Sequence, residues 1–409
     1  MIRINHVAAV NWIPLHKIAI GIILPIYLSG CLSGQEDAAG ISRDQDRELS
    51  IGKTFSITSQ LLGEERPIIV SLPTDYDSTQ ADYPVMYLTD GRQNIWHVMG
   101  TIEVLTRTGS IPPLIVIGIE STNRMRDFTM TKGANQPGSG GGHQFLAFME
   151  QELIPYVDSA YRTHPFRLLE GHSLGGLFAA SIFIENPDLF DGYIVMSPAL
   201  WWNNEDLTKQ VAPFLKAHTH LDKALFFGIG TGESSPDFGM RKELKNFVDA
   251  LAAGQASGLR YERKEMEDEG HMSSALLSNY YGLKFIFADM AFPDSLFENY
   301  SDELFLSHER QIMEKYGSLA KQSAESYVRL AFQLREKNKF AGACTVLQRS
   351  VEAYPFDVGL MNLLADTYGL NGEINQAILV YQQAIATSKK YHYLREEEFE
   401  KQIDRLKNK

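Results

Sequence analysis

Residues 166–186 restrict the fold of this chain more than any other segment, because they combine a short apolar run, a glycine-rich turn and a longer apolar run. The turn reads Gly171-His172-Ser173-Leu174-Gly175. Its glycines suit a sharp change from strand to helix, where side chains at those positions would collide with neighbouring backbone. Such a turn lifts the hydroxyl of Ser173 clear of a sheet. Two glycines and a serine match this pattern by chance in about one chain in seven of this length, so the flanking elements decide its meaning.

Those elements alternate between strands and helices. Residues 54–73 alternate apolar and polar side chains around a turn at 63–65, which predicts an antiparallel hairpin. Strands are predicted for residues 83–90, 113–120, 166–170, 192–196 and 224–229, of which 113–120 has the pattern of a strand buried on both faces. A more exposed strand is predicted for 261–266, and helices for 145–161 and 174–186. This order predicts an α/β fold with a mostly parallel central sheet that is covered on both faces.

The last third of the chain is predicted to be all-α. Apolar residues recur there at an offset of 34, in the pairs Tyr327/Met361, Leu330/Leu364, Ala331/Ala365, Leu334/Tyr368, Ala343/Ala377, Leu347/Tyr381 and Ser350/Ala384. Large and small apolar residues in this order resemble the tetratricopeptide repeat, although a generic pair of helical hairpins is the alternative. Two units are fewer than the roughly three needed for independent stability. We therefore expect them to pack on a connecting helix at 304–316 and on a charged helix at 394–406.

Length and charge limit the classes of function. The 409 residues suggest two or three domains, with boundaries at 48–292, 293–323 and 324–409. The net charge of −13 and the lack of a basic stripe argue against a nucleic-acid partner. No His, Cys and carboxylate cluster has metal-ligand spacing, and the glycine run 138–142 lacks the lysine of a phosphate-binding loop. We therefore expect neither a metal nor a cofactor.

The first 30 residues are predicted to be a lipoprotein signal peptide. Arg3 and Lys17 precede an apolar run at 18–28 that is too short for a comfortable transmembrane helix. The run ends in Leu28-Ser29-Gly30-Cys31, which resembles a bacterial lipobox with Cys31 as the lipidated residue. A plain secretory signal is the alternative.

Residues 31–47 are polar and are predicted to form a flexible tether. In the lipoproteins that this segment resembles, a leucine after the lipidated cysteine, here Leu32, implies sorting to the outer membrane, facing the periplasm. The sequence thus places the protein in a bacterial cell envelope with its membrane contact made through the lipid.

The residue order that hydrolases with this turn share is nucleophile, acid, histidine. His271 lies in a loop between the last predicted strand and a helix that begins near Ser274, which is where a general base belongs. Glu233 follows the strand at 224–229 and is the first candidate for the acid, with Asp237 as the alternative.

Two backbone N–H groups are expected to bind a developing oxyanion. One is that of Leu174, at the start of the predicted helix after Ser173. The other is that of Arg92, after a turn at Asp90-Gly91 in which Gly91 permits the tight backbone. The Asp90-Gly91 pair is otherwise an ordinary turn, and the second donor would then be elsewhere.

Five segments in order resemble the putative esterase branch of the α/β-hydrolases, which includes the enterobactin and salmochelin esterases and has feruloyl esterases and mycolyltransferases among its wider relatives. They are residues 87–91, 123–129, 152–157, 171–176 and 197–202. The resemblance covers about residues 48–292. It implies Ser173 as nucleophile, His271 as base and Glu233 as acid, with oxyanion donors at Leu174 and Arg92. Some siderophore esterases of this group work with a Ser–His pair alone. Met130 stands where relatives often have proline, so the loop 128–143 is expected to form a rim or mobile lid of its own shape.

Four side chains are candidates for substrate binding. Arg124 and Arg126 could bind an anionic or catecholate group, or one of them could pair with Asp127 to brace its loop. Trp201 and Trp202 could offer flat faces to an aromatic acyl group or a sugar, or one of them could lie in the core, which is expected of Trp202.

The sequence therefore predicts a serine ester hydrolase of the bacterial envelope, acting on a small-molecule ester of siderophore or other carboxylic type. An acyltransferase with a sugar or lipid acceptor and a feruloyl or acetyl carbohydrate esterase are alternatives. A third alternative is a non-catalytic scaffold whose repeats recruit a protein partner. The repeats also suggest a protein partner or self-association for the enzyme.

Overall fold

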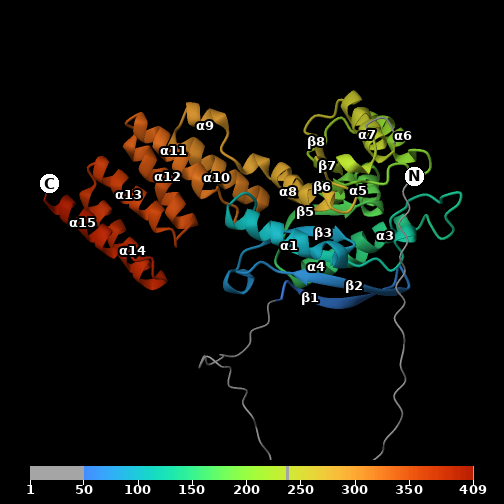
Figure 1. Ribbon diagram of the computed structural model, residues 1–409, viewed down its shortest axis with the longest axis horizontal. Helices are drawn as coiled ribbons and strands as arrows, with labels where there is room; N and C mark the ends of the chain where they lie inside the picture. Colours follow the sequence, from blue (N-terminus) through green and yellow to red (C-terminus); the bar gives the residue numbers. More distant parts are fainter. Residues whose placement is uncertain (1–49, 236–238, 409) are drawn as a thin grey trace, which may run out of the picture. The chain divides into compact units, whose positions relative to one another are not determined.

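The computed structural model describes residues 50–235 and 239–408, and a single mixed sheet organises the first two thirds of them (Figure 1). The strands are β1 (Lys53–Ser59), β2 (Glu64–Ser71), β3 (Tyr83–Thr89), β4 (Ile115–Ile119), β5 (Thr163–His172), β6 (Gly192–Met196), β7 (Ala224–Gly230) and β8 (Arg260–Met266). In these residues the sheet has eight strands in the order β1-β2-β4-β3-β5-β6-β7-β8. The β1–β2 hairpin and the β2–β4 pair are antiparallel, and all other neighbours are parallel. The predicted fold class is confirmed.

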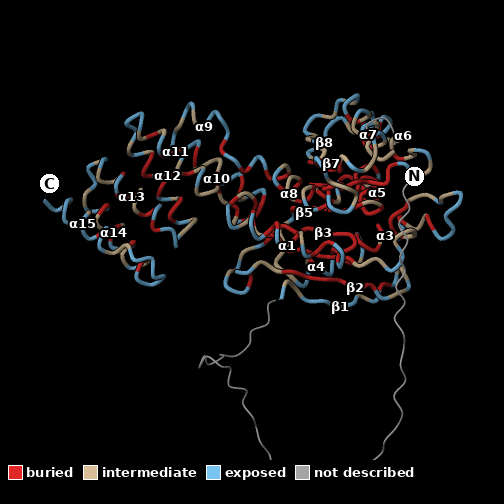
Figure 2. The backbone as a smooth tube through the Cα atoms, in the orientation of Figure 1, coloured by how far each residue is buried: buried red, intermediate tan, exposed pale blue. Residues whose placement is uncertain are grey.

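Helices cover both faces of the sheet, as its apolar strands require. They are α1 (Gly91–Arg107), α2 (Arg124–Asp127), α3 (Gly142–Phe148), α4 (Ile154–Ala160), α5 (Leu174–Glu185), α6 (Asp206–Ala217), α7 (Met240–Ala253) and α8 (Ser274–Ile286). Apolar side chains of α1 and α8 share one core with one face of the strands, and α3, α5, α6 and α7 share the other. Figure 2 shows the central strands buried between these layers, whereas the edge strands β1 and β8 are mostly exposed or half-buried. Both faces of the strand that leads to Ser173 are therefore shielded from water.

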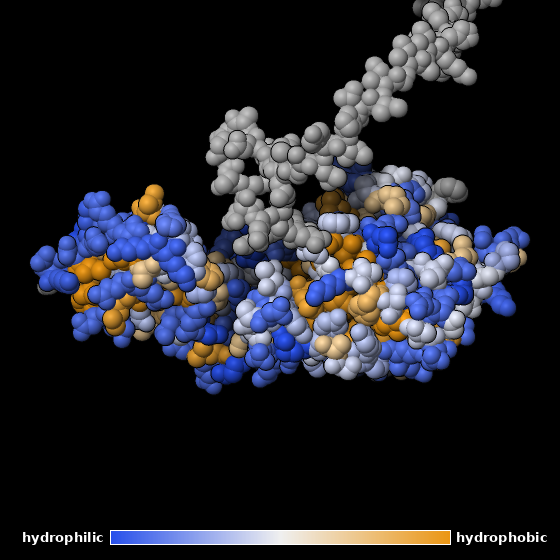
Figure 3. Space-filling view, turned by 90° about the horizontal axis from the view of Figure 1, so that it is seen from below, coloured by the Kyte–Doolittle hydropathy of each residue, from blue (hydrophilic) through white to orange (hydrophobic). Residues whose placement is uncertain are grey.

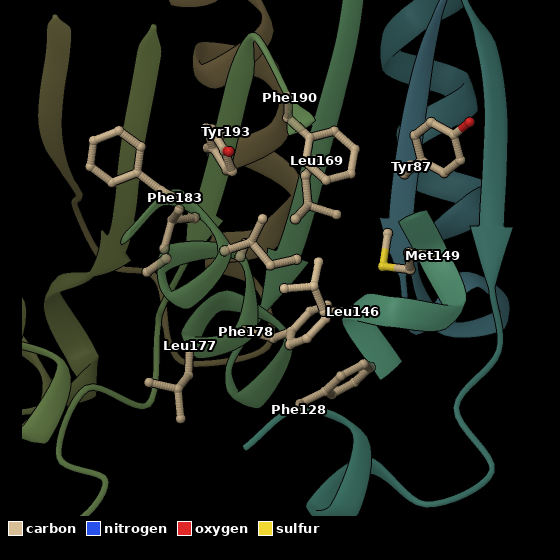
Figure 4. Close-up of a cluster of buried hydrophobic side chains, with 14 of the residues drawn as sticks. Tyr87, Phe128, Leu146, Met149, Leu169, Leu177, Phe178, Phe183, Phe190 and Tyr193 are labelled. Carbon is tan, nitrogen blue, oxygen red and sulfur yellow. The ribbon is translucent and has the colours of Figure 1, made fainter. Parts of the chain in front are cut away.

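On the face shown in Figure 3, apolar side chains reach the surface only in separate patches between hydrophilic ones. The main apolar packing is internal. Figure 4 shows the cluster in which Leu177 and Phe178 of α5 and Leu146 of α3 gather beside Leu169 of β5. Because α5 follows Ser173 directly, this core fixes the direction in which the turn at Ser173 points.

The helix predicted for 145–161 is interrupted. A π-helical turn at Met149–Leu153 separates α3 from α4. The Glu152 carboxylate in this turn accepts hydrogen bonds from Ser59 Oγ at 2.5 Å and from the N–H groups of Gln60 and Leu61 at 2.9 and 3.1 Å. Pro155 has no N–H to continue a regular helix. The contacts of Glu152 with the β1–β2 turn hold the wider turn in place.

The chain after residue 293 is helical, as predicted. Its helices are α9 (Asp294–Glu298), α10 (Asp302–Tyr316), α11 (Ala324–Glu336), α12 (Phe340–Ala353), α13 (Val358–Leu370), α14 (Ile374–Tyr391) and α15 (Glu396–Lys407). The small repeat residues Ala331, Ala343, Ala365 and Ala377 are fully buried. Such residues let neighbouring helices approach closely. The paired helices fit the 34-residue period, while their assignment to the tetratricopeptide class stays a prediction.

Tyr316 at the end of α10 joins the helical part to the sheet. Its ring lies 4.8 Å from that of Phe166 on β5 and 5.0 Å from that of Phe287, and its hydroxyl donates to Asp289. Only 1% of Tyr316 is exposed. None of the helices in residues 50–235 and 239–408 combines the length and apolarity that a membrane crossing requires.

Candidate active site

Ser173 occupies the turn between β5 and α5 with φ of 61° and ψ of −116°. This backbone conformation is strained for a residue with a side chain and persists only where the surroundings enforce it. Ser173 N–H donates to the carbonyl of Met196 on β6, and the Ser173 carbonyl accepts from Ala199 N–H. The turn is thus held by the segment that follows the neighbouring strand.

The glycines of the turn are required by close backbone contacts. A Cβ on Gly171 would lie 2.1 Å from the Gly175 carbonyl oxygen, and one on Gly175 would lie 2.4 Å from Thr89 Oγ1. Neither position has room for a side chain. Their absence lets α5 start directly against β5 and brings the Ser173 turn against the end of β3.

A hydrogen-bonded series runs from Ser173 through His271 to Glu233. His271 Nε2 lies 3.1 Å from Ser173 Oγ, and His271 Nδ1 lies 2.7 Å from Glu233 Oε2. Because a carboxylate only accepts, the proton of a neutral imidazole belongs on Nδ1 and leaves Nε2 free to accept from the serine hydroxyl. The three residues come from the ends of β5, β7 and β8, as predicted from the sequence. The alternative acid Asp237 lies outside the described residues.

The environment of Glu233 keeps its carboxylate charged and immobile. Its side chain is 1% exposed. The second oxygen, Oε1, accepts from Ser197 Oγ at 2.5 Å, Gly230 N–H at 2.7 Å and Ser274 Oγ at 3.0 Å. Burial raises the pKa of Glu233, but the hydrogen bonds from His271, Ser197 and Gly230 outweigh it, so the pKa lies below its usual value. The other oxygen is then directed at His271.

The two predicted oxyanion donors are at helix N-termini. Leu174 is the first residue of α5 and Arg92 the second of α1, so neither N–H has a carbonyl partner within its helix. The positive φ of the second turn falls on Asp90, at 51°, and not on Gly91. Gly91 is needed instead for close packing, since its Cβ would lie 2.7 Å from the Gly118 carbonyl carbon. The donor roles of Leu174 and Arg92 stay predictions.

The side chain of Arg92 turns outward, where it is 79% exposed and pairs with Glu120 at 3.0 and 3.1 Å. Asp90 is next to the Ser173 turn, because a Cβ on Gly175 would lie 3.6 Å from its Oδ2. Arg124 holds both oxygens of Asp90, at 2.8 and 2.9 Å, and is 40% exposed. Arg124 therefore lies beside the start of α1 with part of its guanidinium facing solvent.

Arg126 is the arginine that braces its loop. Its Nε donates to Asp127 at 2.7 Å, and its terminal nitrogens bind Glu64 at 2.7 and 3.1 Å. Fully buried Arg66 binds the same two carboxylates. The alternative in which one arginine pairs with Asp127 thus describes Arg126, while Arg124 pairs with Asp90.

The two tryptophans differ as predicted. Trp202 is buried, and its Nε1 donates to the carbonyl and hydroxyl oxygens of Thr131, each at 3.2 Å. Trp201 is 44% exposed. Within the loop 128–143, Gly140 N–H donates to Thr129 Oγ1 and Gly133 N–H to Ser139 Oγ. These hydrogen bonds stabilise the loop internally, and its role as a rim or lid stays a prediction.

Three polar side chains at the site were missed by the sequence analysis. Ser197 and Ser274 bind Glu233, and His172 Nε2 donates to the His271 carbonyl at 2.7 Å. Ser197 follows β6 as Ser173 follows β5, and the carboxyl ends of parallel strands share one edge of a sheet. The position of Ser197 at the end of a predicted strand was the sequence signal that could have identified it. Residues 50–235 and 239–408 hold no group of three or more His, Cys, Asp or Glu side chains arranged as a metal site.

Several proteins with sequences similar to this chain are named as esterases. The family model described as "Putative esterase" matches residues 59–267. The ferri-bacillibactin esterase BesA of Bacillus subtilis (strain 168) is 31% identical over 216 residues, which cover 47% of this chain and 75% of that protein. A siderophore triacetylfusarinine C esterase of Aspergillus fumigatus is 28% identical over 196 residues, covering 42% of this chain and 66% of that protein.

The solved structure of an IroE-like serine hydrolase from Shewanella oneidensis matches with a TM-score of 0.60 at 26% identity and covers 79% of this chain and 99% of that one. The family model spans about half of the chain and includes the strand, turn and helix around Ser173. With its α/β-hydrolase fold, this chain belongs to the putative esterase family and is a carboxylic ester hydrolase.

Proposed function

We propose that the protein hydrolyses esters through an acyl-enzyme on Ser173, with His271 as general base and acid and Glu233 as the carboxylate that orients it. One observation carries the proposal: the series of contacts at 3.1 and 2.7 Å that joins the three side chains at the edge of the sheet. A serine hydroxyl is a weak nucleophile unless an adjacent base accepts its proton. The imidazole is in place to do so.

In the first half of the reaction, Ser173 Oγ attacks the ester carbonyl carbon while its proton passes to His271 Nε2. The resulting imidazolium faces the Glu233 carboxylate through Nδ1. The carbonyl oxygen becomes an oxyanion, which the N–H groups of Leu174 and Arg92 would stabilise together with the positive ends of α5 and α1. The C–O bond then breaks, and the leaving alcohol takes the proton from Nε2.

In the second half, water attacks the acyl carbon and gives its proton to His271 Nε2. The second tetrahedral species collapses, the acid leaves, and Ser173 Oγ recovers the proton. Each proton moves between Nε2 and an oxygen at the same place, so one imidazole serves both halves. No cofactor is needed for these steps.

The substrate we propose is a siderophore-type ester, because two relatives are named as esterases of such compounds. Arg124 and Trp201 would contact the substrate. Arg124 is fixed by Asp90 beside the Ser173 turn yet keeps part of its surface open, and Trp201 exposes an aromatic face in the segment after β6. A guanidinium and an exposed aromatic ring are each suited to contact an anionic aromatic acyl group.

The test uses the full chain with a fluorophosphonate probe and a panel of siderophore trilactones, feruloyl and acetyl sugars, and p-nitrophenyl esters. We expect labelling of the wild type and of the remote control Ser159→Ala, none of Ser173→Ala, and the highest kcat/KM on a trilactone. Labelling that persists in Ser173→Ala would contradict the nucleophile. A preference for sugar esters, or capture of the acyl group by added alcohol beyond its mole fraction, would contradict the substrate or the hydrolytic outcome.

A further inference from the structure

Glu170 is a fully buried carboxyl group that the proposed mechanism does not use. It lies on β5, three residues before Ser173, and is 0% exposed. Its partners on the adjacent strands are Leu88 of β3 and Ile194 of β6, both also 0% exposed. A charge in such surroundings is costly unless it is paired. The hydrogen-bond partners of the Glu170 side chain therefore decide which of its protonation states is stable.

Asn279 of α8 provides the only hydrogen-bond partner of the Glu170 side chain in residues 50–235 and 239–408. Asn279 Nδ2 donates to Glu170 Oε2 at 2.7 Å, and Asn279 is itself 0% exposed. Two buried oxygens at this contact have no partner among the described residues, Glu170 Oε1 and Asn279 Oδ1. An ionised Glu170 would leave both oxygens unpaired, which is costly for buried polar atoms.

One proton on Glu170 would involve both of these unpaired oxygens in a hydrogen bond. A carboxylic acid has one O–H donor and one carbonyl acceptor, and a primary amide has the complementary pair. With the proton on Oε1, Glu170 can donate to Asn279 Oδ1 while Oε2 continues to accept from Nδ2. Two planar groups joined in this way form a closed ring of two hydrogen bonds.

We propose that Glu170 is protonated in the working enzyme and forms a cyclic acid–amide pair with Asn279, which positions the segment carrying His271 against the strand that leads to Ser173. This inference rests on the proposed function, in which Ser173 and His271 must keep their contact. Glu170 is a positioning residue, because it touches neither the substrate nor the reacting atoms.

The pair joins the two segments that bear the nucleophile and the base. Glu170 and His172 project from the same face of β5 because side chains alternate along a strand. His172 binds the His271 carbonyl at 2.7 Å, and Glu170 binds Asn279 further along, in α8. The first residue of α8, Ser274, binds Glu233. A shift of α8 would therefore displace both His271 and a donor to Glu233.

Tight packing makes α8 sensitive to such a shift. A Cβ on Gly228 of β7 would lie 2.1 Å from Ser278 Oγ, and one on Gly282 would lie 2.8 Å from Ile194 Cγ2. These close contacts leave no room between α8 and the sheet for side chains to rearrange locally around an unpaired charge. Repulsion between an ionised Oε1 and Asn279 Oδ1 would therefore be relieved by movement of the helix or its leading loop.

Among the described residues, no nearby cation offsets the cost of ionising Glu170. Burial raises its pKa to about 8, against the opposing effect of the Asn279 hydrogen bond. The same core face holds Tyr316 and, partly buried, Tyr280 and Tyr281 of α8, and Lys264 of β8 lies over the ring of Tyr281. The histidines on this face are His172 of β5 and His97 of α1. Burial lowers the pKa of both, that of His172 to about 4, so they are neutral at pH 7. The tyrosines of β3 and β6 belong to the opposite core, and Lys284 of α8 lies over the ring of Tyr280.

The direction of the pH effect follows from this raised pKa. Glu170 keeps its proton in the folded protein up to about pH 8 and loses it above. We expect kcat/KM of the wild type to fall as pH rises through this value. Glu170→Gln keeps the ring, because its amide can donate to Asn279 Oδ1 and accept from Nδ2, but it cannot ionise. This variant should keep at least half of the wild-type kcat/KM at pH 7 and lose the alkaline fall.

The experiment records pH profiles of kcat/KM for the wild type, Glu170→Gln, Glu170→Leu and the control Glu309→Gln. Glu309 is also buried with a raised pKa, but it lies in α10 and accepts from Tyr327. Glu170→Leu removes the ring, and kcat/KM should fall roughly tenfold or more at every pH, since small displacements of catalytic groups are costly. Glu309→Gln should show the wild-type profile. Equal alkaline limbs in the wild type and Glu170→Gln would overturn the proposal, as would a Glu309→Gln profile that moves with that of Glu170→Gln.

A second readout needs no substrate. The infrared difference spectrum between the wild type and Glu170→Gln at pH 7 should show the loss of a protonated carboxyl band. Loss of an ionised carboxylate band instead would overturn the proposal. Persistent hydrolysis by Ser173→Ala would remove the proposed function alone, because the band reports the proton on Glu170 whether or not Ser173 is the nucleophile.

Discussion

Glu233 is the residue that distinguishes a three-residue site from a Ser–His pair. Three donors hold its Oε1, so its Oε2 is fixed toward His271 Nδ1. In Glu233→Gln an amide replaces the carboxylate, and it can neither stabilise the imidazolium nor select the Nδ1–H tautomer. We expect kcat/KM to fall on the order of 10³-fold or more, measured on a p-nitrophenyl ester.

Glu267→Gln is the matched control, because Glu267 is an exposed carboxylate four residues before His271. It should leave kcat/KM within about twofold. If Glu233→Gln were also within a few fold of the wild type, the Ser–His pair would suffice and the carboxylate would be structural.

At the scale of elements, the turn between β5 and α5 depends on its glycines. In Gly171→Ala the new Cβ would meet the Gly175 carbonyl at 2.1 Å, so α5 must move away from β5. We expect a loss of about 1–3 kcal/mol in the free energy of unfolding, as for other overpacked sites, and a large loss of kcat with Ser173 displaced. Chemical denaturation and steady-state kinetics measure the two effects.

Gly100→Ala is the control for this substitution. Gly100 lies within α1, and nothing is within 4 Å of its ideal Cβ. Alanine should stabilise the helix there by about 0.5–1 kcal/mol without a change in kcat. An unchanged kcat in Gly171→Ala would mean that the turn tolerates the added methyl group and that close packing does not position Ser173.

The contact between β2 and α2 predicts a stability that depends on pH. The hydrogen bond from Arg126 is the main cause that lowers the pKa of Glu64 from 4.5 to about 2. A lowered pKa adds stability above the unfolded value, and this stability is lost as pH falls through the folded one. We expect Glu64→Gln to unfold more easily than the wild type by about 1 kcal/mol at pH 7, because the pair is partly screened by solvent.

This difference should shrink as pH falls from 4.5 toward 2, as followed by urea unfolding at each pH. The neighbouring Glu65→Gln is the control, since exposed Glu65 has only a 3.4 Å contact with Thr58. A pH-independent difference for Glu64→Gln would show that the amide disturbs packing and that no charge pair is lost.

The elements were predictable where local pattern decides them. Apolar runs marked the strands, and the glycines around Ser173 marked the turn, because both depend on neighbours in sequence. The π-helical turn at 149–153 was not predictable, since it depends on Glu152 meeting residues 59–61. A turn was expected at Asp90-Gly91, but its positive φ at Asp90 and the close contact of Gly91 with Gly118 were not predicted.

The same limit applies to the candidate site. Chain order led to His271 and Glu233, because topology places strand ends at one edge. The pairing of Arg124 with Asp90, 34 residues away, and the donors Ser197 and Ser274 depend on side-chain packing between separate elements. Packing of that kind leaves no periodic trace in a single sequence.

At the scale of the whole molecule, Tyr316 couples the helical part to the sheet. Tyr316→Ala removes two aromatic contacts and the hydrogen bond to Asp289, and we expect a loss of about 3–5 kcal/mol in the free energy of unfolding. The kcat of the folded protein should not change. Phe166, which Tyr316 contacts, lies seven residues before Ser173, about 23 Å along the strand.

Phe332→Ala is the matched control, because Phe332 is a half-exposed aromatic residue of α11. It should change stability by less than about 0.5 kcal/mol. A change in the kcat of Tyr316→Ala at temperatures where the protein is fully folded would contradict this expectation. It would show that the helical part acts on the catalytic site.

The proposed lipid anchor would attach the whole molecule to the membrane through a single atom, the sulfur of Cys31. Its residues lie outside the described part of the chain, so the proposal rests on the sequence Leu28-Ser29-Gly30-Cys31. The chain has two cysteines, Cys31 and Cys344, and the second is buried in α12. Serine cannot form the thioether to lipid, and buried acyl chains supply about 0.8 kcal/mol per CH₂ of membrane affinity.

In a bacterial host we therefore expect Cys31→Ser to move the protein from the membrane fraction to the soluble fraction, while Cys344→Ser stays with the membrane. Ester hydrolysis per molecule should be the same for both, because Ser173 and its partners lie in residues that neither change touches. Retention of Cys31→Ser on membranes would contradict lipidation at this residue. Release of Cys344→Ser would instead tie membrane attachment to the fold of the helical part, and detergent phase partitioning of all three proteins distinguishes these outcomes.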